Sequence, residues 1–277
     1  MIGSGIGGSK SPALHMAEAK ALGFRLTYER FDAAAGDFDP DQLDTLLTRL
    51  QADGFAGVNV THPFKQRIMD HLDALSPDAR ALGAVNTIVF RDGRRVGYNT
   101  DWIGWKRGFE RALPDARLGR VVQLGAGGAG SAVAYAALTL GVGHLVLHDV
   151  DAGRAAGLCE NLRGLFGAAR VEVAESLAPA IAAADGLINA TPIGMQQYPG
   201  TPVDVSLLRP ELWVAEIVYV PPETELLKQA RRIGCPTVDG VGMVVFQAAV
   251  AFELFTGRVP DPERMLRAFH GTSLAGA

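Results

Sequence analysis

The sequence predicts an α/β protein built from two α/β domains, and three observations support this fold class. Short apolar runs alternate with segments of helical periodicity along most of the 277 residues, which is typical of βαβ units. Many of the 33 glycines fall at turns between these segments, where connections between strands and helices need them. Hydrophobic residues make up 48% of the chain, enough to bury the core of one large domain or two ordinary ones.

In the N-terminal part of the chain, strands and helices are predicted in alternation. The first strand is short, because Met1 falls where a strand should already be running. We therefore expect either a stunted edge strand or a start a few residues upstream. In chain order, the pattern predicts a strand ending at Ile2–Gly3, a helix over Pro12–Leu22, a strand over Leu26–Phe31, a helix over Pro40–Asp53, a strand over Gly57–Val60 and a helix after Pro63.

A second unit begins after Pro114 and continues the alternation. From Gly242 onward, the pattern indicates one long apolar helix followed by a shorter one. We therefore expect a substrate domain at residues 1–101, completed by C-terminal helices at 240–277, a Rossmann-type nucleotide domain at 102–239, and a ligand cleft between them. The second unit is predicted to contain strands over Arg120–Leu124, His144–Asp149, Ala169–Val173, Gly186–Ala190, Trp213–Val218 and Pro236–Val238, and helices over Ala129–Leu140, Ala152–Leu165, Ala178–Ala184 and Glu223–Ile233.

Composition excludes several classes of protein. With 26 Lys+Arg against 30 Asp+Glu and no basic stripe, we expect no nucleic-acid partner. The N-terminus lacks the basic and apolar regions of a signal peptide, and the apolar stretch Val241–Phe255 is interrupted by Gln247 and Glu253, so we expect no membrane span. The isolated Cys159 and Cys235 form neither a disulfide framework nor a metal motif, so we expect two buried thiols, a reducing cytoplasm and no metal site.

The strongest cofactor signal is a glycine-rich turn of sequence GAGGAG. It follows a predicted strand and opens a predicted helix, which is the context that a dinucleotide-binding G-x-G-x-x-G motif requires. The first glycine permits the tight turn, the second lets the backbone approach the pyrophosphate, and the third allows close packing of the helix. The N–H groups at the helix N-terminus can then bind phosphate. The predicted cofactor-binding residues of this turn are Gly125, Ala126, Gly127, Gly128 and Ala129.

The choice of cofactor depends on Asp149, which ends the second strand of this unit at the roughly 20-residue spacing that this fold uses. A carboxylate there accepts hydrogen bonds from the adenosine ribose hydroxyls and repels a 2′-phosphate, so we predict NAD. Two alternatives stay open. Asp149 could instead cap the next helix, a role that Asp151 could also take, and the nearby Arg154 keeps NADP in consideration.

Three groups of polar residues in the first domain exceed what the fold alone needs. The first is Ser9-Lys10-Ser11-Pro12, where one serine could simply cap the helix that proline opens. The second is Asn59-Val60-Thr61-His62-Pro63-Phe64-Lys65, after a buried strand. The third comprises Ala84-Val85-Asn86-Thr87 and Tyr98-Asn99-Thr100-Asp101. Their side chains suit a small, polyhydroxylated acid.

The order of the motifs resembles that of a known family. SKSPxxH, NVTxPFK, GAVNT, NTD, GAGGAG, NATPxGM and DGxGMxxxQA follow one another between Gly3 and about Phe269. In this set and order the chain resembles the shikimate dehydrogenase family, and in particular its NAD-preferring quinate/shikimate dehydrogenase branch. The resemblance implies two α/β domains around a cleft, NAD(P) on the second, and reversible reduction of 3-dehydroshikimate to shikimate by a monomer or homodimer.

Carried over by position, the resemblance assigns roles to residues of this chain. Lys65 resembles the catalytic lysine, with Asp101 beside it, and Gly242 and Met243 fall in the stretch that approaches the nicotinamide. We also place Thr191, Pro192, Val218 and Gly240 with Met243 among the cofactor-binding residues. Ser9 and Ser11 resemble the hydroxyls that hold the substrate carboxylate, Tyr219 the tyrosine that closes over it, and Asn59, Thr61, Asn86, Asp101 and Gln247 the ligands of the ring hydroxyls.

The chemistry supports the pair Lys65 and Asp101 independently of the resemblance. Oxidation of an alcohol by NAD requires that a base take the hydroxyl proton as the hydride leaves. A lysine can be this base where partial desolvation favours its neutral form, and an aspartate can orient it. The simpler alternatives are a solvated helix residue for Lys65 and a helix cap for Asp101.

Some positions depart from the commonest family pattern. NADP-linked members typically have Asn-Arg-Thr at Asp149-Val150-Asp151, and Val150 cannot grip a 2′-phosphate as that arginine does. Trp102 and Trp105 are bulkier than usual and either belong to the core or narrow the pocket. Quinate-using relatives often have threonine where Ser11 stands, so shikimate is favoured over quinate.

Other functions stay open as alternatives. Within the same class these are a quinate-oxidising or an aminoshikimate-type dehydrogenase, and a biosynthetic role would fit shikimate, whereas a catabolic one would fit quinate with NAD. A second class is a non-catalytic sensor of quinate or shikimate, which intact Lys65 and Asp101 argue against. An amino-acid or methylenetetrahydrofolate dehydrogenase on a similar frame is disfavoured by the polar set of the first domain.

Overall fold

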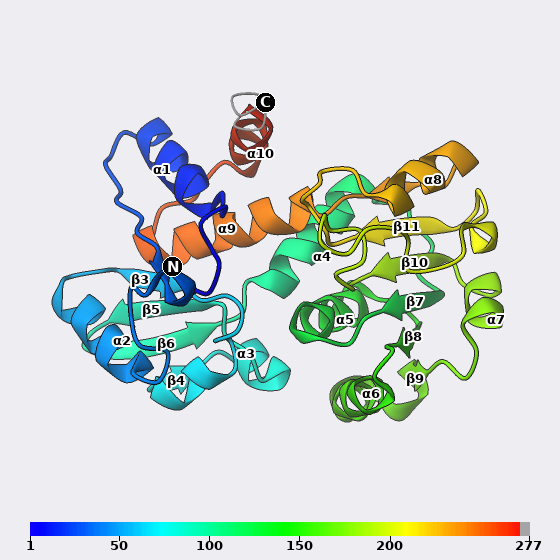
Figure 1. Ribbon diagram of the computed structural model, residues 1–277, viewed down its shortest axis with the longest axis horizontal. Helices are drawn as coiled ribbons and strands as arrows, with labels where there is room; N and C mark the ends of the chain where they lie inside the picture. Colours follow the sequence, from blue (N-terminus) through cyan, green and yellow to red (C-terminus); the bar gives the residue numbers. More distant parts are fainter. Residues whose placement is uncertain (272–277) are drawn as a thin grey trace. The chain divides into compact units, whose positions relative to one another are not determined.

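The computed structural model describes residues 1–271, and the chain divides into two compact units (Figure 1). Unit 1 comprises Met1–Thr100 together with the chain from Val245, and unit 2 comprises Asp101–Val244. The second division falls inside α9 (Val241–Thr256), a few residues beyond the expected limit at 239. Each unit has its own sheet and hydrophobic core, and the predicted α/β class is confirmed.

Unit 1 contains a four-stranded sheet of order β3-β5-β6-β4 and a separate pair of parallel strands, β1 and β2. Helix α2 covers its core with Leu43, Leu46, Leu47 and Leu50, which recur at the helical period and are all buried. The elements of this unit are β1 (Ile2–Gly3), α1 (Ser11–Ala21), β2 (Phe31–Asp32), η1 (Ala33–Ala35), α2 (Leu43–Ala52), β3 (Gly57–Asn59), η2 (Arg67–His71), β4 (Ala74–Leu75), α3 (Pro77–Leu82), β5 (Thr87–Arg91), β6 (Arg94–Tyr98) and α10 (Pro262–Gly271), with α9 completing it.

Two predictions for unit 1 were wrong or incomplete, and one hairpin was not predicted. The strand expected over Leu26–Phe31 is reduced to β2, because β1 has two residues and offers ladder partners only to Phe31 and Asp32. The helix after Pro63 is the 3₁₀ helix η2, in which Met69 N–H donates to the Gln66 carbonyl (3.1 Å) in the tighter i→i+3 pattern. The antiparallel hairpin of β5 and β6 was not anticipated, although Asp92 and Gly93 at its turn both have positive φ.

Unit 2 is a six-stranded parallel sheet of order β12-β11-β10-β7-β8-β9 with helices on both faces. The chain runs outward from β7 through β8 to β9 and then returns to the other side of β7, so the order reverses between β7 and β10. Ligands of such sheets bind outside the carboxyl ends of the strands at this reversal. The elements are α4 (Asp101–Ala112), β7 (Arg120–Leu124), α5 (Gly128–Leu140), β8 (His144–His148), α6 (Ala152–Phe166), η3 (Ala168–Arg170), β9 (Val171–Val173), α7 (Leu177–Ala182), β10 (Gly186–Asn189), η4 (Val205–Leu207), β11 (Trp213–Glu216), α8 (Glu225–Ile233) and β12 (Thr237–Val238).

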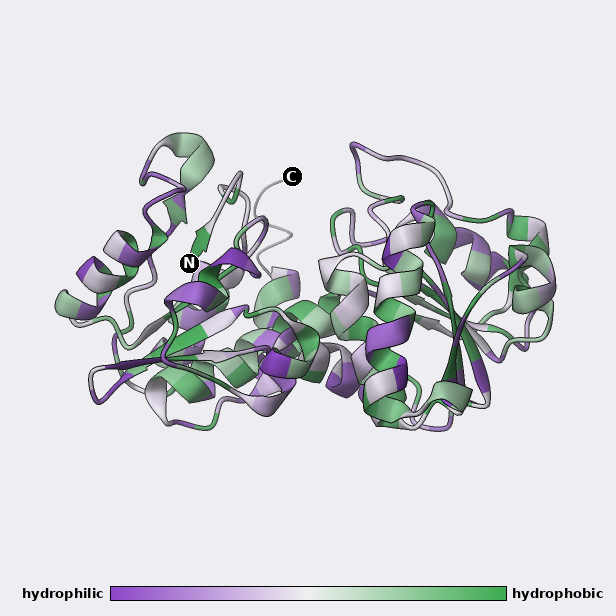
Figure 2. Cartoon of the chain, turned by 90° about the horizontal axis from the view of Figure 1, so that it is seen from below, coloured by the Kyte–Doolittle hydropathy of each residue, from purple (hydrophilic) through white to green (hydrophobic). Residues whose placement is uncertain are grey.

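Hydrophobic residues concentrate on the strands and on the inward sides of the helices, as the hydropathy colouring in Figure 2 shows. Trp105 is 3% exposed in the core of unit 2, and Trp102 packs edge-on against Tyr135. Both contacts support the interpretation of these tryptophans as core residues. Cys159 and Cys235 are free and buried, as predicted. Within residues 1–271, no helix is both long and apolar enough to cross a membrane.

Candidate functional site

The glycine-rich turn begins directly after β7, at the reversal of strand order. Gly125 has φ +95°, and a Cβ there would lie 2.5 Å from the Ala190 carbonyl oxygen at the end of β10. A Cβ on Gly130 would lie 2.3 Å from the Gly125 oxygen. Glycine is therefore required at both positions, by conformation and by space. The turn and the end of β10 are in direct contact, and α5 begins at Gly128 with its N-terminus at this turn.

A residue not predicted for the site, Gln123, supports the turn from within the sheet. It is fully buried in β7 and donates from Nε2 to the carbonyls of Gly125 (2.9 Å) and Gly130 (2.8 Å). Because two carbonyls of the turn are bonded to this amide, the turn and the start of α5 keep a fixed shape. A polar residue inside the otherwise apolar strand sequence RVVQL was the available signal.

Asp149 closes the turn from the side of β8. Its Oδ2 accepts the Ala126 N–H (2.8 Å) and its Oδ1 accepts the Asp151 N–H (2.9 Å). The cap of α6 is Asp151, which accepts from the N–H groups of Gly153 and Arg154 and pairs with the Arg154 guanidinium (3.0 Å). The helix-capping alternative for Asp149 is thus wrong. A carboxylate offers about four acceptor positions, so Asp149 retains capacity for ribose hydroxyls.

The remaining predicted cofactor residues follow β10, β11 and β12. Thr191 donates from its N–H (3.0 Å) and its hydroxyl (2.7 Å) to Asn189 Oδ1. A Cβ on Gly240 would lie 2.4 Å from the Ile217 oxygen and 2.8 Å from the Val218 oxygen, so the structure brings Gly240 and Val218 together. Pro192 is exposed, and Met243 is half-buried against the core of unit 2. Of these positions, Gly240 is the one where the neighbouring backbone leaves no space for a side chain.

In unit 1, three of the predicted substrate ligands belong to one buried hydrogen-bond network. Asn59 donates from Nδ2 to Thr87 Oγ1 (3.0 Å), and the Thr87 hydroxyl donates to Asn86 Oδ1 (3.1 Å). Asn86 donates to Thr100 Oγ1 (3.0 Å), and the Thr100 hydroxyl lies 3.4 Å from Gln247 Oε1. Asn59, Asn86 and Gln247 thus have fixed orientations, whereas the linking residues Thr87 and Thr100 were not predicted.

Tyr28 extends this network and was also missed. Its hydroxyl donates to Asn59 Oδ1 (2.7 Å), and burial raises the pKa of Tyr28, so the donor stays protonated. The Asn59 side chain is therefore oriented from both of its ends. The sequence carries a weak signal for Tyr28, since it ends a segment that alternates apolar or aromatic with polar residues, Phe24-Arg25-Leu26-Thr27-Tyr28.

The two serines of the first motif stand at the start of α1. The helix cap is Lys10, without a side-chain capping bond, and Ser9 Oγ accepts the Ser11 N–H (3.3 Å). The preceding glycine-rich loop is held by Asp32, which accepts the N–H groups of Gly5 and Ile6 at 2.8 Å each. The loop that leads to both hydroxyls is thus tied to β2. Neither serine is the cap residue itself, although Ser9 accepts the first N–H of α1 from the position before the cap.

The other predicted substrate residues are distributed over both units. Thr61 and Lys65 lie between β3 and η2, half-buried, and the Lys65 carbonyl accepts the Val85 N–H (2.8 Å). Asp101 is buried, 8% exposed, as the first residue of α4 in unit 2. Tyr219 follows β11 and is half-buried. The backbone bond of Lys65 anchors its segment to the residue before Asn86, just ahead of β5.

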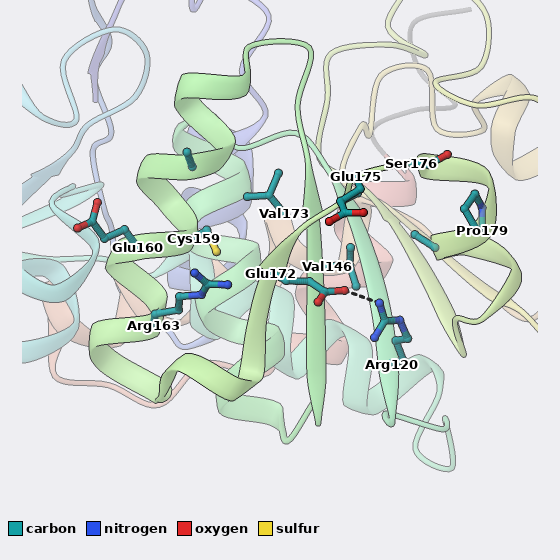
Figure 3. Close-up of a pocket in the computed structure, with 13 residues that line it drawn as sticks. Arg120, Val146, Cys159, Glu160, Arg163, Glu172, Val173, Glu175, Ser176 and Pro179 are labelled. Atoms are coloured by element: carbon teal, nitrogen blue, oxygen red, sulfur yellow. Dashed lines mark hydrogen bonds and ion pairs between the residues drawn. The ribbon is translucent and has the colours of Figure 1, made fainter.

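A separate cavity of about 990 Å³ opens at the edge strand β9, between residues of α6 and α7 (Figure 3). Its charged side chains are engaged with their surroundings: Arg120 pairs with Glu172, and Arg163 Nε donates to the Val171 carbonyl (2.8 Å). None of the predicted site residues within 1–271 is among those that line it. This cavity is therefore distinct from the glycine turn and from the polar network of unit 1.

Two family models match parts of this chain. Residues 1–88 match the family model described as the shikimate dehydrogenase substrate binding domain, and residues 240–268 match that of the shikimate 5'-dehydrogenase C-terminal domain. A shikimate dehydrogenase (NADP(+)) of Streptomyces avermitilis is 54% identical over 96% of this chain and 92% of its own length. A quinate/shikimate dehydrogenase (NAD(+)) of Corynebacterium efficiens is 47% identical over 97% of this chain and 96% of its own.

A solved structure shares the fold over its whole length. Quinate dehydrogenase from Corynebacterium glutamicum in complex with NAD superposes with a TM-score of 0.92 at 46% identity, covering 98% of this chain and 97% of that one. The matched models, the identity over nearly the whole length of these relatives and the shared fold lead to one conclusion: the chain belongs to the shikimate dehydrogenase family.

Proposed function

We propose that this protein is an NAD(P)-dependent dehydrogenase that interconverts shikimate and 3-dehydroshikimate. The observation that carries the proposal is the buried network that fixes Asn59, Asn86 and Gln247 in one unit. Amides held in this way present donors and acceptors at defined positions, which suits a small ring with several hydroxyls. The relatives at 54% and 47% identity carry the names of enzymes with this chemistry.

Each group of residues has a role in binding. Ser9 and Ser11 receive the substrate carboxylate, on a loop that Asp32 holds. Asn59, Thr61, Asn86 and Gln247 bind the ring hydroxyls, and Tyr219 closes over the carboxylate. A carboxylate on the substrate favours hydroxyl donors over carboxylate side chains, because like charges would repel.

The proton transfer is assigned to Lys65 with Asp101. Lys65 takes the proton of the reacting hydroxyl in the oxidation and returns it in the reduction, while Asp101 orients the amine. The dinucleotide, when bound, supplies the hydride acceptor. The chain holds it at the N-terminus of α5, which begins at Gly128, and with the loops at Thr191, Val218 and Gly240, where Gly240 lies too close to the Ile217 oxygen for a side chain.

We propose that NAD is preferred over NADP. Asp149 is fixed by the Ala126 and Asp151 N–H groups, so its carboxylate stays at the end of β8 where an adenosine ribose is bound in this fold. Val150 beside it is 96% exposed and offers no charge to a 2′-phosphate. Arg154, the nearest alternative cation, is already paired with Asp151. One relative named for NAD(+) and another named for NADP(+) make this a question for measurement.

The test is a steady-state panel of shikimate, quinate and aminoshikimate, each with NAD and with NADP. We expect the highest kcat/KM for shikimate with NAD. Quinate carries an additional hydroxyl beside its carboxylate, and Ser11 matches relatives that are strict for shikimate. A higher kcat/KM with NADP would remove the role given to Asp149. Binding of shikimate without turnover of any of the three would favour a sensor.

A further inference from the structure

One buried carboxylate of unit 2 is not used by the proposed chemistry. Glu216 ends β11 and is 1% exposed. Asn189 Nδ2 lies 3.0 Å from each of its oxygens, the Val218 N–H donates to Oε1 (3.0 Å), and the Thr224 hydroxyl donates to Oε2 (3.0 Å). Burial raises the pKa of Glu216 to about 7, against the effect of these donors. Burying a carboxyl group to this extent costs free energy of folding, and the hydrogen bonds that it accepts must offset this cost.

The donors come from the carboxyl end of β10 and from the two ends of the loop that connects β11 to α8. Asn189 ends β10, Val218 follows β11, and Thr224 caps α8 by accepting the Leu227 N–H (3.3 Å). Glu216 is therefore the common acceptor that joins these loops. The packing around it is close, since a Cβ on Gly194 would lie 3.1 Å from Thr224 Cγ2 and 3.7 Å from Glu216 Oε2.

Asn189 transmits this arrangement to the loop after β10. The Nδ2 of Asn189 faces the Glu216 oxygens as a donor, so its Oδ1 points the other way. Oδ1 then accepts both the N–H and the hydroxyl of Thr191, while Nδ2 also donates to the Ile193 carbonyl (3.0 Å). The orientation of Thr191 thus depends on the Glu216 carboxylate through two successive hydrogen bonds, with Asn189 between them.

The position of these loops along the sheet decides which part of a ligand they would contact. The glycine turn follows β7, and Asp149 follows β8, on one side of it. The loops joined by Glu216 follow β10 and β11, on the other side. With pyrophosphate at the turn and the adenosine ribose at Asp149, the loops held by Glu216 face the nicotinamide half.

We propose that Glu216 is a positioning residue that holds the loops for the nicotinamide half of the dinucleotide. This inference rests on the proposed function. It predicts a selective effect: loss of the carboxylate weakens ligands that carry the nicotinamide and leaves ligands that end at the second ribose unchanged. ADP-ribose is such a ligand, because it keeps the adenosine and both phosphates of NADH and lacks the nicotinamide.

The experiment compares NADH and ADP-ribose binding by calorimetry in the full chain and in Glu216→Gln. The glutamine removes the charge and replaces one carboxylate oxygen with an amide N–H₂, which cannot accept from Asn189 Nδ2, so at least one charge-assisted bond is lost. We expect the Kd for NADH to rise about tenfold, the loss typical of one such bond, while the Kd for ADP-ribose stays the same. Glu216→Asp keeps a carboxylate on a shorter side chain. Its Kd for NADH should lie between that of the unmodified protein and that of Glu216→Gln. Glu225→Gln, an exposed carboxyl on α8, is the matched control and should bind both ligands normally.

The outcomes separate this inference from the proposed function. Retained ADP-ribose binding in Glu216→Gln shows that unit 2 is folded, so a selective loss of NADH supports the proposal. Equal weakening of both ligands, in this variant and in Glu216→Asp, overturns it, because the carboxyl would then support the unit as a whole. Unchanged NADH binding overturns it as well. Failure of the unmodified protein to bind NADH would contradict the proposed function instead.

Discussion

His15, in the first substrate motif, makes the stability of unit 1 depend on pH. It is 1% exposed and packs against the rings of Tyr28 (centroids 4.8 Å apart), Phe252 (5.9 Å) and Phe255 (6.0 Å). Its Nδ1 has no hydrogen-bond partner within residues 1–271. Burial lowers the pKa of His15 from 6.5 to about 3, because the aromatic surroundings cannot solvate an imidazolium.

The sign and size of the effect follow from proton linkage. The folded protein keeps His15 neutral down to about pH 3, whereas the unfolded chain binds a proton below pH 6.5. The contribution of the neutral His15 to the free energy of unfolding is therefore fully present above pH 6.5. It is lost as the pH falls from 6.5 toward 3. One pKa unit corresponds to about 1.4 kcal/mol, so this histidine should lower the free energy of unfolding by about 2 kcal/mol between pH 7 and pH 5.

The assay is urea unfolding at pH 7 and pH 5, followed by far-UV circular dichroism. His15→Phe keeps a ring among the aromatic neighbours and removes the titrating group, so it should lose about 2 kcal/mol of the pH dependence. His270→Gln, at an exposed position of α10, is the control and should retain it. If the free energy of unfolding fell equally in His15→Phe and in the unmodified protein between pH 7 and pH 5, a neutral, buried His15 would be refuted.

Three further substitutions test separate parts of the structure. Gly125→Ala places a Cβ 2.5 Å from the Ala190 oxygen at φ +95°, and should cost roughly 2 kcal/mol in urea unfolding and weaken NADH binding; normal values for both would contradict the tight turn. Arg264→Met removes the guanidinium that forms two bonds to the fully buried Glu18 (2.5 and 2.8 Å). It should lower the free energy of unfolding by roughly 3–5 kcal/mol, because the carboxylate is left buried without its partner. Adding Glu18→Gln should restore much of this loss. Asp149→Asn keeps an acceptor for the turn but loses the charge, so the NAD/NADP ratio of kcat/KM should fall about tenfold; an unchanged ratio would show that another residue sets the preference.

The strands and the glycine turn that depend only on neighbouring residues were predicted from local sequence patterns. The apolar runs RVVQL and HLVLH became buried strands of the parallel sheet, and the glycine turn was located because strand, turn and helix follow one another in sequence. Asp149 was found by its spacing from Gly125. Its bond to the Ala126 N–H could not be foreseen, because it depends on the distance between two strand ends.

Features that depend on tertiary pairing were missed. The extended segment before Phe31 has the alternation of a strand, but a strand needs a partner, and β1 provides one for two residues only. Tyr28 and Glu216 carry polar atoms into buried positions whose partners lie on distant segments. Sequence can flag them as polar residues in or beside apolar stretches, but only the fold shows which loops and amides they orient.

In the proposed reaction Lys65 transfers the proton of the reacting hydroxyl. This role is tested by the kcat for shikimate oxidation with NAD in the unmodified protein and in Lys65→Ala. The lysine acts in the transition state more than in binding, so kcat should fall by roughly 10²- to 10⁴-fold with little change in the KM for shikimate. A kcat comparable to that of the unmodified protein would contradict the assignment and the mechanism built on it.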